Sequence, residues 1–225
     1  MIIVFDLDDT LYSEIEYVKS GFSHVSKVMS AFVSQPDIEI YDCLMNILKR
    51  DGRGHVFDTF LSERSIYSSK LAMRLVMEYR KHNPKISLSP ETYEVLEYLR
   101  HGHNLYLVTD GNKLVQERKV QALGIEFFFK RIFITHRFGL HASKPALKCF
   151  EIIKEIESVD WGQIIYIGDD PNKDFFNLNK VGAKTIRRRF GRFKTLSLDK
   201  DYEALWEIRE LDELPLIIKN LHIDS

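Results

Sequence analysis

The fold is decided by the stretch Met1-Ile2-Ile3-Val4-Phe5-Asp6-Leu7-Asp8-Asp9-Thr10, in which five apolar residues lead directly into three carboxylates. A short, unbroken apolar run predicts a strand that is buried on both faces, as in a parallel sheet. The carboxylates then follow the carboxyl end of the strand, where open α/β sheets bind their ligands. An extended backbone places the side chains of Asp6 and Asp8 on one face. A bound cation would relieve their repulsion, so the stretch favours a catalytic edge, with an Asp-rich turn as the alternative.

Length and charge limit the class of protein and its partners. At 225 residues the chain suits one domain, or one domain with an insert. The formal net charge of −1 creates no field that would attract nucleic acid or an anionic membrane. No apolar stretch approaches the ~20 residues of a membrane span. The one basic run, Arg187-Arg188-Arg189, is interpreted as a solvated loop, because a nucleic-acid site needs a broader patch with interleaved aromatic residues.

Cysteine usage indicates the compartment. Cys43 and Cys149 are the only cysteines, and two such widely spaced residues make neither a disulfide framework nor a zinc site. We expect two buried thiols in a reducing cytoplasm. The oligomeric state is left open.

Residues 13–85 carry helical periodicity and almost no strand signal. Apolar residues recur there at the spacing of one helix face, as in Val18, Phe22, Val25 and Met29. A structureless loop of this length is uncommon inside a compact domain. We therefore predict an all-helical insert at 13–85 within a core formed by 1–12 and 86–225.

The rest of the chain alternates short apolar runs with helical segments. Further strands are predicted at 105–108, 132–134, 164–167 and 183–186, while 205–208 is either an edge strand or part of a helix. Pro145 has the residue type that begins a helix. Alternation of strand and helix indicates a parallel sheet with right-handed crossovers and helices on both faces. The predicted fold class is α/β, a Rossmann-like doubly wound parallel sheet with an inserted all-helical domain.

Polar residues of complementary chemistry follow the first two predicted strands. Asp6 and Asp8 follow the first strand. Thr109 ends the second strand and offers a hydroxyl group beside the backbone amides of Asp110 and Gly111. Glycine lets the backbone approach an anion closely, so this segment is a candidate phosphate-binding loop.

Two later segments supply the remaining candidate site residues. Asp169 and Asp170 follow the fourth strand, with Asp174 one helical turn further on. A helix beginning at Pro145 would place Lys144 at its N-terminus, where phosphate is favoured. A carboxylate nucleophile, a carboxylic acid, a cation-binding cluster, a hydroxyl group and a lysine are what phosphoryl transfer requires.

Four of these segments resemble, in order, the motifs of the haloacid dehalogenase-like superfamily, in the subfamily with a helical cap. They are Phe5-Asp6-Leu7-Asp8-Asp9-Thr10-Leu11, then Thr109, then Lys144, and finally Gly168-Asp169-Asp170-Pro171-Asn172-Lys173-Asp174. The resemblance implies that Asp6 is the nucleophile that forms an aspartyl-phosphate. It implies that Asp8 protonates the leaving oxygen and then deprotonates water, with Thr10 as a supporting residue. Thr109 and Lys144 would bind the phosphoryl oxygens.

The same resemblance implies a Mg²⁺ site. The carboxylates of Asp6 and Asp169 and the backbone carbonyl of Asp8 would hold the ion, and hard oxygen ligands suit it. Asp174 is expected to orient the phosphate-binding lysine or a metal-bound water. Asp170 is left open between a direct ligand and an outer-shell residue.

The predicted function is a Mg²⁺-dependent phosphatase acting on a small soluble phosphomonoester, either a sugar phosphate or a nucleoside monophosphate. In superfamily members that dehalogenate, the position that matches residue 8 resembles tyrosine rather than aspartate. Asp8 therefore favours phosphate chemistry. One alternative is a phosphotransferase or phosphomutase that uses the same site. A non-catalytic ligand-binding module of the same fold is the other.

Overall fold

The structure is a computed structural model of the chain, and it describes residues 1–223. The chain forms two compact units. One unit contains Met1–Glu14 together with the chain from Ser87 onward, and the other contains Ile15–Ile86. None of the described helices combines the length and the apolar character needed to cross a membrane.

Six parallel strands form the sheet of the first unit: β1 (Ile2–Phe5), β2 (Asn104–Thr109), β3 (Arg131–Ile134), β4 (Ile164–Gly168), β5 (Lys184–Arg188) and β6 (Trp206–Ile208). Their order is β3-β2-β1-β4-β5-β6, and every neighbouring pair is parallel. The chain thus winds outward from β1 in both directions, the arrangement that binds ligands where the strand order reverses. The predicted α/β class with a parallel sheet is confirmed, and 205–208 contains the edge strand β6 rather than helix.

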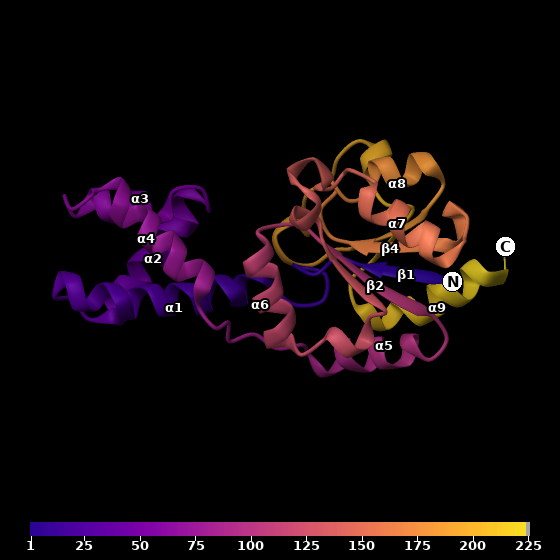
Figure 1. The fold of residues 1–225 in the computed structure, drawn as a ribbon, viewed down its shortest axis with the longest axis horizontal. Helices are drawn as coiled ribbons and strands as arrows, with labels where there is room; N and C mark the ends of the chain where they lie inside the picture. Colours follow the sequence, from indigo (N-terminus) through magenta and orange to yellow (C-terminus); the bar gives the residue numbers. More distant parts are fainter. Residues whose placement is uncertain (224–225) are drawn as a thin grey trace. The chain divides into compact units, whose positions relative to one another are not determined.

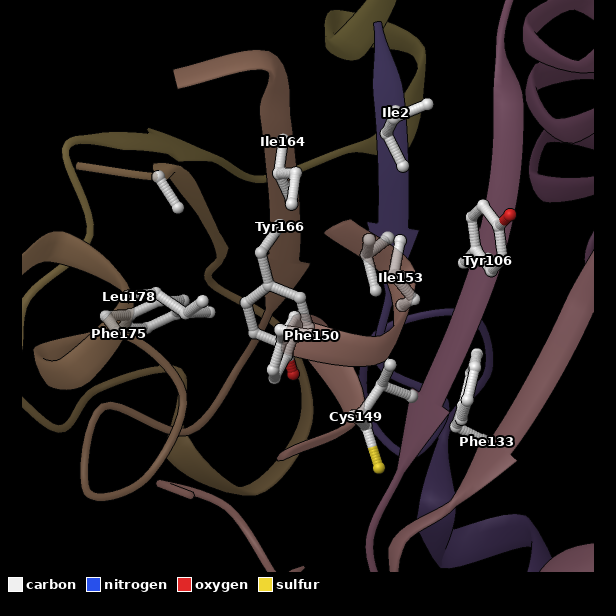
Figure 2. Close-up of a cluster of buried hydrophobic side chains, with 13 residues drawn as sticks. Ile2, Tyr106, Phe133, Cys149, Phe150, Ile153, Ile164, Tyr166, Phe175 and Leu178 are labelled. Carbon is white, nitrogen blue, oxygen red and sulfur yellow. The ribbon is translucent and has the colours of Figure 1, made fainter. Parts of the chain in front are cut away.

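Helices cover both faces of this sheet: α5 (Pro90–Arg100), α6 (Lys113–Leu123), α7 (Lys148–Glu157), α8 (Phe176–Val181) and α9 (Leu214–Ile223). Figure 1 shows α7 and α8 over one face and α5 and α9 over the other. On the α7 face, strand residues such as Ile2, Tyr106 and Tyr166 pack with Phe150 and Ile153 of α7 (Figure 2). Successive strand residues point to opposite faces, so one apolar run supplies the core on both sides.

The chain between β1 and β2 folds into a unit of helices: α1 (Glu14–Val33), α2 (Asp37–Asp51), α3 (Val56–Glu63) and α4 (Ser69–Lys81). These helices share a core whose fully buried members include Val25, Met29, Leu44, Phe60 and Leu75. Gly21 on α1 admits the ring of Tyr79, since a Cβ atom at this position would lie 2.4 Å from ring carbon Cε2. The unit therefore has its own packed interior.

Two sequence-based predictions are wrong in detail. The helix expected to begin at Pro145 begins at Lys148, because the preceding residues form a turn in which the amide of Ala146 donates to the carbonyl of Ser143 at 2.9 Å. Cys149 is buried as expected, but Cys43 is only half-buried, because it lies at the edge of the helical core, where Nη1 of Arg64 contacts its sulfur at 3.5 Å.

Two residues of the basic run that the sequence places in a solvated loop, Arg187 and Arg188, belong instead to β5, which extends two residues beyond the predicted strand. Arg187 is fully buried and Arg188 is 6% exposed. Nε of Arg187 donates to the carbonyl of Asp169 at 3.2 Å, and Nη1 of Arg188 donates to the carbonyl of Thr10 at 2.8 Å. Burial of a guanidinium group is tolerated where its donors find acceptors, and sequence alone does not show those acceptors.

Candidate active site

The carboxyl ends of β1 and β4 bring acids from distant parts of the chain together. The amide of Asp6 donates to the carbonyl of Ile167 on β4 at 2.8 Å, which extends the β1–β4 pairing by one residue. Carboxylate oxygens of Asp6, Asp169 and Asp174 all lie within 4.8 Å of one another, and all three residues are buried. This acid cluster is therefore built by sheet register rather than by a single loop.

Lys144 lies inside this cluster, although it does not begin a helix. Its Nζ atom is 2.8 Å from Oδ1 of Asp6 and 2.7 Å from Oδ1 of Asp174, and its side chain is 1% exposed. Burial alone would lower the pKa of Lys144, but the two carboxylates raise it well above its ordinary value. The lysine is therefore a fixed positive charge beside Asp6.

The hydroxyl group of Tyr166 on β4 bridges Lys144 and Asp174. It accepts a hydrogen bond from Nζ of Lys144 at 2.7 Å and donates to Oδ1 of Asp174 at 3.0 Å. Burial, followed by the nearby Asp174 carboxylate, raises the pKa of Tyr166 well above 10. The phenol stays protonated and helps to fix the ammonium group of Lys144.

The three clustered acids differ in how many donors they already have. Asp174 accepts from Tyr166 and Lys144 on Oδ1 and from the amides of Asp169 and Asp170 on Oδ2. These contacts use about all four lone-pair positions of a carboxylate. Asp174 therefore orients its neighbours rather than offering an oxygen atom to a cation.

Asp169 is in the opposite situation. Within residues 1–223, no side-chain donor forms a hydrogen bond to its carboxylate. Burial, with the neighbouring carboxylates of Asp174 and Asp6, raises the pKa of Asp169 to about 9. Burial likewise raises the pKa of Asp6 to about 6, against the lowering effect of Lys144. The raised pKa values show that the positive charges nearby do not fully offset the burial of these two acids, and hard oxygen donors suit a divalent cation such as Mg²⁺.

Asp170 stabilises the turn that follows β4. Its Oδ1 atom accepts from the backbone amide and the side-chain amide of Asn172 at 3.1 and 2.7 Å. Nζ of Lys173 lies 3.9 Å from Oδ2. Asp170 is not a member of the acid cluster, so the geometry gives it a supporting position in the loop.

The carboxylate of Asp8 turns towards α6 instead of joining the acid cluster. Nζ of Lys119 lies 2.7 Å from Oδ1 and 2.9 Å from Oδ2. Tyr12 donates to Oδ1 at 2.6 Å, and Nε2 of Gln116 donates to Oδ2 at 3.0 Å. Burial would raise the pKa of Asp8, but Lys119 and these hydrogen bonds hold it below 3.8. Asp8 is therefore ionised at neutral pH in this arrangement.

The predicted phosphate-binding loop ends β2 next to these acids. Thr109 is 1% exposed, and its Oγ1 atom has no hydrogen-bond partner among the described residues. Asp110 accepts from Thr135 at 2.6 Å and from the amide of Lys144 at 3.1 Å, so its side chain ties the loop to the lysine segment. Gly111 has a φ of +130°, a conformation that favours glycine. A buried, unpartnered hydroxyl group is expensive, so the site is suited to a ligand oxygen at Thr109.

Asp9 anchors the candidate catalytic loop, residues 6–10 after β1, to its surroundings. Asp9 accepts from the amide of Glu14 at 2.8 Å and from the amide of Arg192 at 2.9 Å. Thr10 is fully buried, its Oγ1 atom has no partner among the described residues, and its carbonyl accepts from Arg188. The loop after β5 therefore supports the loop after β1.

Sequence reasoning missed four residues of this site: Lys119, Gln116, Tyr166 and Arg187. Lys119 and Gln116 have the spacing of one helix face, but nothing in the sequence shows that this face is buried. Tyr166 carries a weak signal, since it is the one polar tip in the apolar run Ile164-Ile165-Tyr166-Ile167. A buried aromatic hydroxyl usually finds a partner.

Known proteins are similar to this chain along most of its length. A family model described as haloacid dehalogenase-like hydrolase matches residues 3–187. A glyceraldehyde 3-phosphate phosphatase of Methanocaldococcus jannaschii is 31% identical over 99% of this chain and 98% of the relative. A protein of the same name from Pyrococcus abyssi is 30% identical over 97% of this chain and 94% of the relative.

Solved structures share the fold at lower identity. A haloacid dehalogenase superfamily hydrolase of Geobacter sulfurreducens has a TM-score of 0.70 at 14% identity, covering 96% of this chain and 95% of that one. A magnesium-bound hydrolase of Bacillus subtilis has a TM-score of 0.68 at 19% identity, with 96% and 97% covered. At these identities the similarity concerns the fold alone.

Proposed function

Because the chain belongs to the haloacid dehalogenase-like hydrolase family, we propose that it hydrolyses a small sugar phosphate of the glyceraldehyde 3-phosphate class. The reaction would depend on Mg²⁺ and proceed through an aspartyl-phosphate at Asp6. The enzyme class, a phosphoric monoester hydrolase, is confirmed by the family match and by the phosphatase relatives. The substrate class rests on the names of those relatives.

The observation that carries the proposal is the convergence at one sheet edge. A buried ammonium group contacts the carboxylate of Asp6, while the carboxylate of Asp169 lies near Asp6 without a donor of its own. The unpartnered hydroxyl group of Thr109 ends the adjacent strand β2. A nucleophile, a positive clamp and a cation-binding acid are thereby assembled before any substrate arrives, which is how phosphoryl transfer is catalysed.

Side chains of this protein account for both steps of the reaction, the formation and the hydrolysis of the aspartyl-phosphate. A carboxylate oxygen of Asp6 attacks phosphorus, the bond to the leaving alcohol breaks, and Asp8 delivers a proton to the leaving oxygen. Asp8 then takes a proton from water, whose oxygen attacks the aspartyl-phosphate and releases Asp6 and inorganic phosphate. Because Asp8 is ionised in the resting arrangement, its first proton enters with the substrate, whose phosphate group has a pKa of about 6. Lys144 and Thr109 donate to the phosphoryl oxygens.

The acids fit the ion that the family implies. Lys144 contacts Oδ1 of Asp6, so Oδ2 of Asp6 is the oxygen proposed to bind the ion. Asp169 supplies a second carboxylate. The backbone carbonyl of Asp8 is the third proposed ligand. Bound Mg²⁺ would neutralise this acid cluster and withdraw charge from the phosphoryl oxygens.

Two wider features belong to the same proposal. We infer that the helical insert, predicted at 13–85 and found as the compact unit Ile15–Ile86, acts as a cap that selects small substrates. We also propose a cytoplasmic location, which the two free thiols favour. Both are sequence-based expectations that enzymology of the complete chain and localisation in cells would test.

The test is a phosphate-release screen with Mg²⁺ across glyceraldehyde 3-phosphate, other sugar phosphates and nucleoside monophosphates. We expect one free phosphate per molecule of a short sugar phosphate, and acid-quenched protein should carry a phosphoryl group on Asp6. The Asp6→Asn variant is the control and should show neither signal. Isomerised substrate without free phosphate would identify a mutase instead, and a silent panel would contradict the proposal.

A further inference from the structure

The carboxylate of Asp8 is saturated with donors from its own protein. Oδ1 accepts from the hydroxyl group of Tyr12 at 2.6 Å and from Nζ of Lys119 at 2.7 Å. Oδ2 accepts from the same Nζ at 2.9 Å and from Nε2 of Gln116 at 3.0 Å. A carboxylate has about four lone-pair positions, and these contacts fill them. A leaving-group oxygen can therefore reach Asp8 only if one donor withdraws.

Lys119 is more deeply buried than the carboxylate that it contacts. Its side chain is 3% exposed, whereas that of Asp8 is 19% exposed. Nζ also lies 3.9 Å from Oε1 of Glu14, the first residue of α1. Burying an ammonium group is costly unless carboxylates compensate it. The carboxylates of Asp8 and Glu14 thus compensate the buried charge of Lys119, and the bidentate contact with Asp8 contributes most.

Gln116 connects this arrangement to the end of β2. It lies three residues before Lys119 on α6, so both side chains share one helix face. Its Nε2 atom donates to the carbonyl of Asp110 at 2.8 Å as well as to Asp8. The absence of a side chain at Gly111 admits this amide, because a Cβ atom there would lie 2.8 Å from Nε2. One face of α6 therefore links the loops that follow β1 and β2.

We propose that Lys119 is a positioning residue for Asp8, and that the neutral donors Tyr12 and Gln116 are the partners that a substrate's leaving oxygen displaces. Tyr12 and Gln116 each give the Asp8 carboxylate one hydrogen bond and carry no charge. Lys119 contacts both oxygens and adds the Coulomb attraction of an ion pair, so the neutral donors yield first. The bidentate contact then keeps the plane of the carboxylate fixed while the leaving group binds. This inference rests on the proposed function, since it assigns Lys119 to the proton transfer of Asp8.

Leaving groups of different basicity separate this role from a structural one. The alcohol of glyceraldehyde 3-phosphate needs a proton to leave, whereas p-nitrophenolate is a stable anion and needs none. In Lys119→Met we expect kcat on glyceraldehyde 3-phosphate to fall about 100-fold, within the range of a lost general acid, with KM changed less than about threefold. The pre-steady-state burst of p-nitrophenolate, which reports attack by Asp6, should stay within about threefold of wild type.

Three further variants sharpen the comparison. Lys119→Arg keeps a bidentate cation and should recover at least about tenfold of the lost kcat. Tyr12→Phe removes one neutral donor and should lose less than Lys119→Met. Lys27→Met makes the same chemical change at an exposed position of α1 and should leave both rates unchanged. An equal loss in both leaving-group assays, or no loss in either, would overturn the positioning role.

Failure of the proposed function can be distinguished from failure of this inference. If the wild-type protein releases phosphate from neither compound, the phosphatase assignment fails on its own. Crystal structures of wild type and Lys119→Met then decide the positioning role. A single Asp8 rotamer in wild type that is displaced or split in the variant supports it, and an unchanged rotamer contradicts it.

Discussion

The Nζ atom of Lys144 lies 2.8 Å from Oδ1 of Asp6, and both side chains are almost completely excluded from solvent. The contact joins two residues 138 positions apart in the sequence, Asp6 after β1 and Lys144 in the turn before α7. Lys144 lowers the pKa of Asp6, while burial raises it to about 6. The lysine therefore favours the ionised form of Asp6, the proposed nucleophile, in addition to its proposed contact with phosphate.

Replacing Lys144 by methionine should remove both effects. We expect kcat to fall by about 10²–10³-fold, the loss typical of one oxyanion donor. The pKa of Asp6 should rise, because its nearest positive charge is gone, so the remaining activity should shift to higher pH. A pH–rate profile of Lys144→Met against wild type measures both changes. Lys148→Met, exposed at the start of α7, is the matched control, and a profile with an unshifted acidic limb would contradict the role.

The stability of the metal-free protein and its affinity for Mg²⁺ should both depend on pH. Burial raises the pKa values of Asp6 and Asp169 to about 6 and about 9 in the metal-free protein, above the 3.8 of an unfolded chain. Their contribution to metal-free stability is therefore complete below pH 3.8 and is lost as the pH rises through 6 and then 9.

Mg²⁺ requires the ionised carboxylates, so it must displace the proton on Asp169. Affinity should rise by about tenfold per pH unit between neutral pH and 9, and binding should release protons. Calorimetric titrations in two buffers of different ionisation enthalpy measure that release. Asp169→Asn should abolish it, and a pH-independent affinity would disprove the assignment of Asp169 as a ligand.

The apolar runs made much of this architecture predictable. Because β1, β2 and β4 end at Phe5, Thr109 and Gly168 and pair in parallel, the residues that follow them must meet at one edge. The family and the enzyme class followed from the order of the motifs and are confirmed, while the individual roles stay predictions. Lys144 reaches the cluster from a turn, whereas its neighbour Pro145 suggested the start of a helix.

What sequence could not show is which charges are buried. Arg187 and Lys119 look like solvated residues because their acceptors lie elsewhere in the chain. Arg187 binds the carbonyl of Asp169 and carbonyls of the segment after β5, and Lys119 binds Asp8 across 111 positions. Burial of a charge depends on such distant acceptors, and helix or strand periodicity carries no information about them.

Arg187 should be a major contributor to the stability of the core. Its guanidinium group donates to the carbonyls of Asp169, Phe193 and Leu196 and pairs with Glu203. Arg187→Met leaves these acceptors buried without their donor, so we expect a loss of about 3–5 kcal/mol in the free energy of unfolding.

Urea denaturation of Arg187→Met and wild type, fitted with a common m-value, measures this loss. Arg192→Met is the control: this side chain is exposed and stacks on Phe193 with its guanidinium carbon 5.0 Å from the ring centroid. Its loss should stay below about 1 kcal/mol. Similar losses in the two variants would refute the special contribution of the buried arginine.

The contact between Gly191 and Asp9 predicts a linked effect on stability and catalysis. Gly191 has a φ of +63°, and a Cβ atom there would lie 2.0 Å from Cγ of Asp9. Gly191→Ala must therefore adopt a strained backbone and also push away the carboxylate that accepts from the amides of Glu14 and Arg192. Gly182 has a φ of +87° but nothing within 4 Å of its virtual Cβ, so Gly182→Ala carries the backbone strain alone.

We expect Gly182→Ala to lose about 1–2 kcal/mol of stability and to keep wild-type kcat. Gly191→Ala should lose about 2 kcal/mol more, the cost typical of overpacking. It should also lower kcat, because Asp9 lies between Asp8 and Thr10 in the catalytic loop. Thermal unfolding and steady-state kinetics on the same preparations measure both quantities. If the two alanine variants were equally stable and equally active, the loop after β5 would not support the catalytic loop, and the position of Asp9 would have to be maintained by β1 and α1 alone.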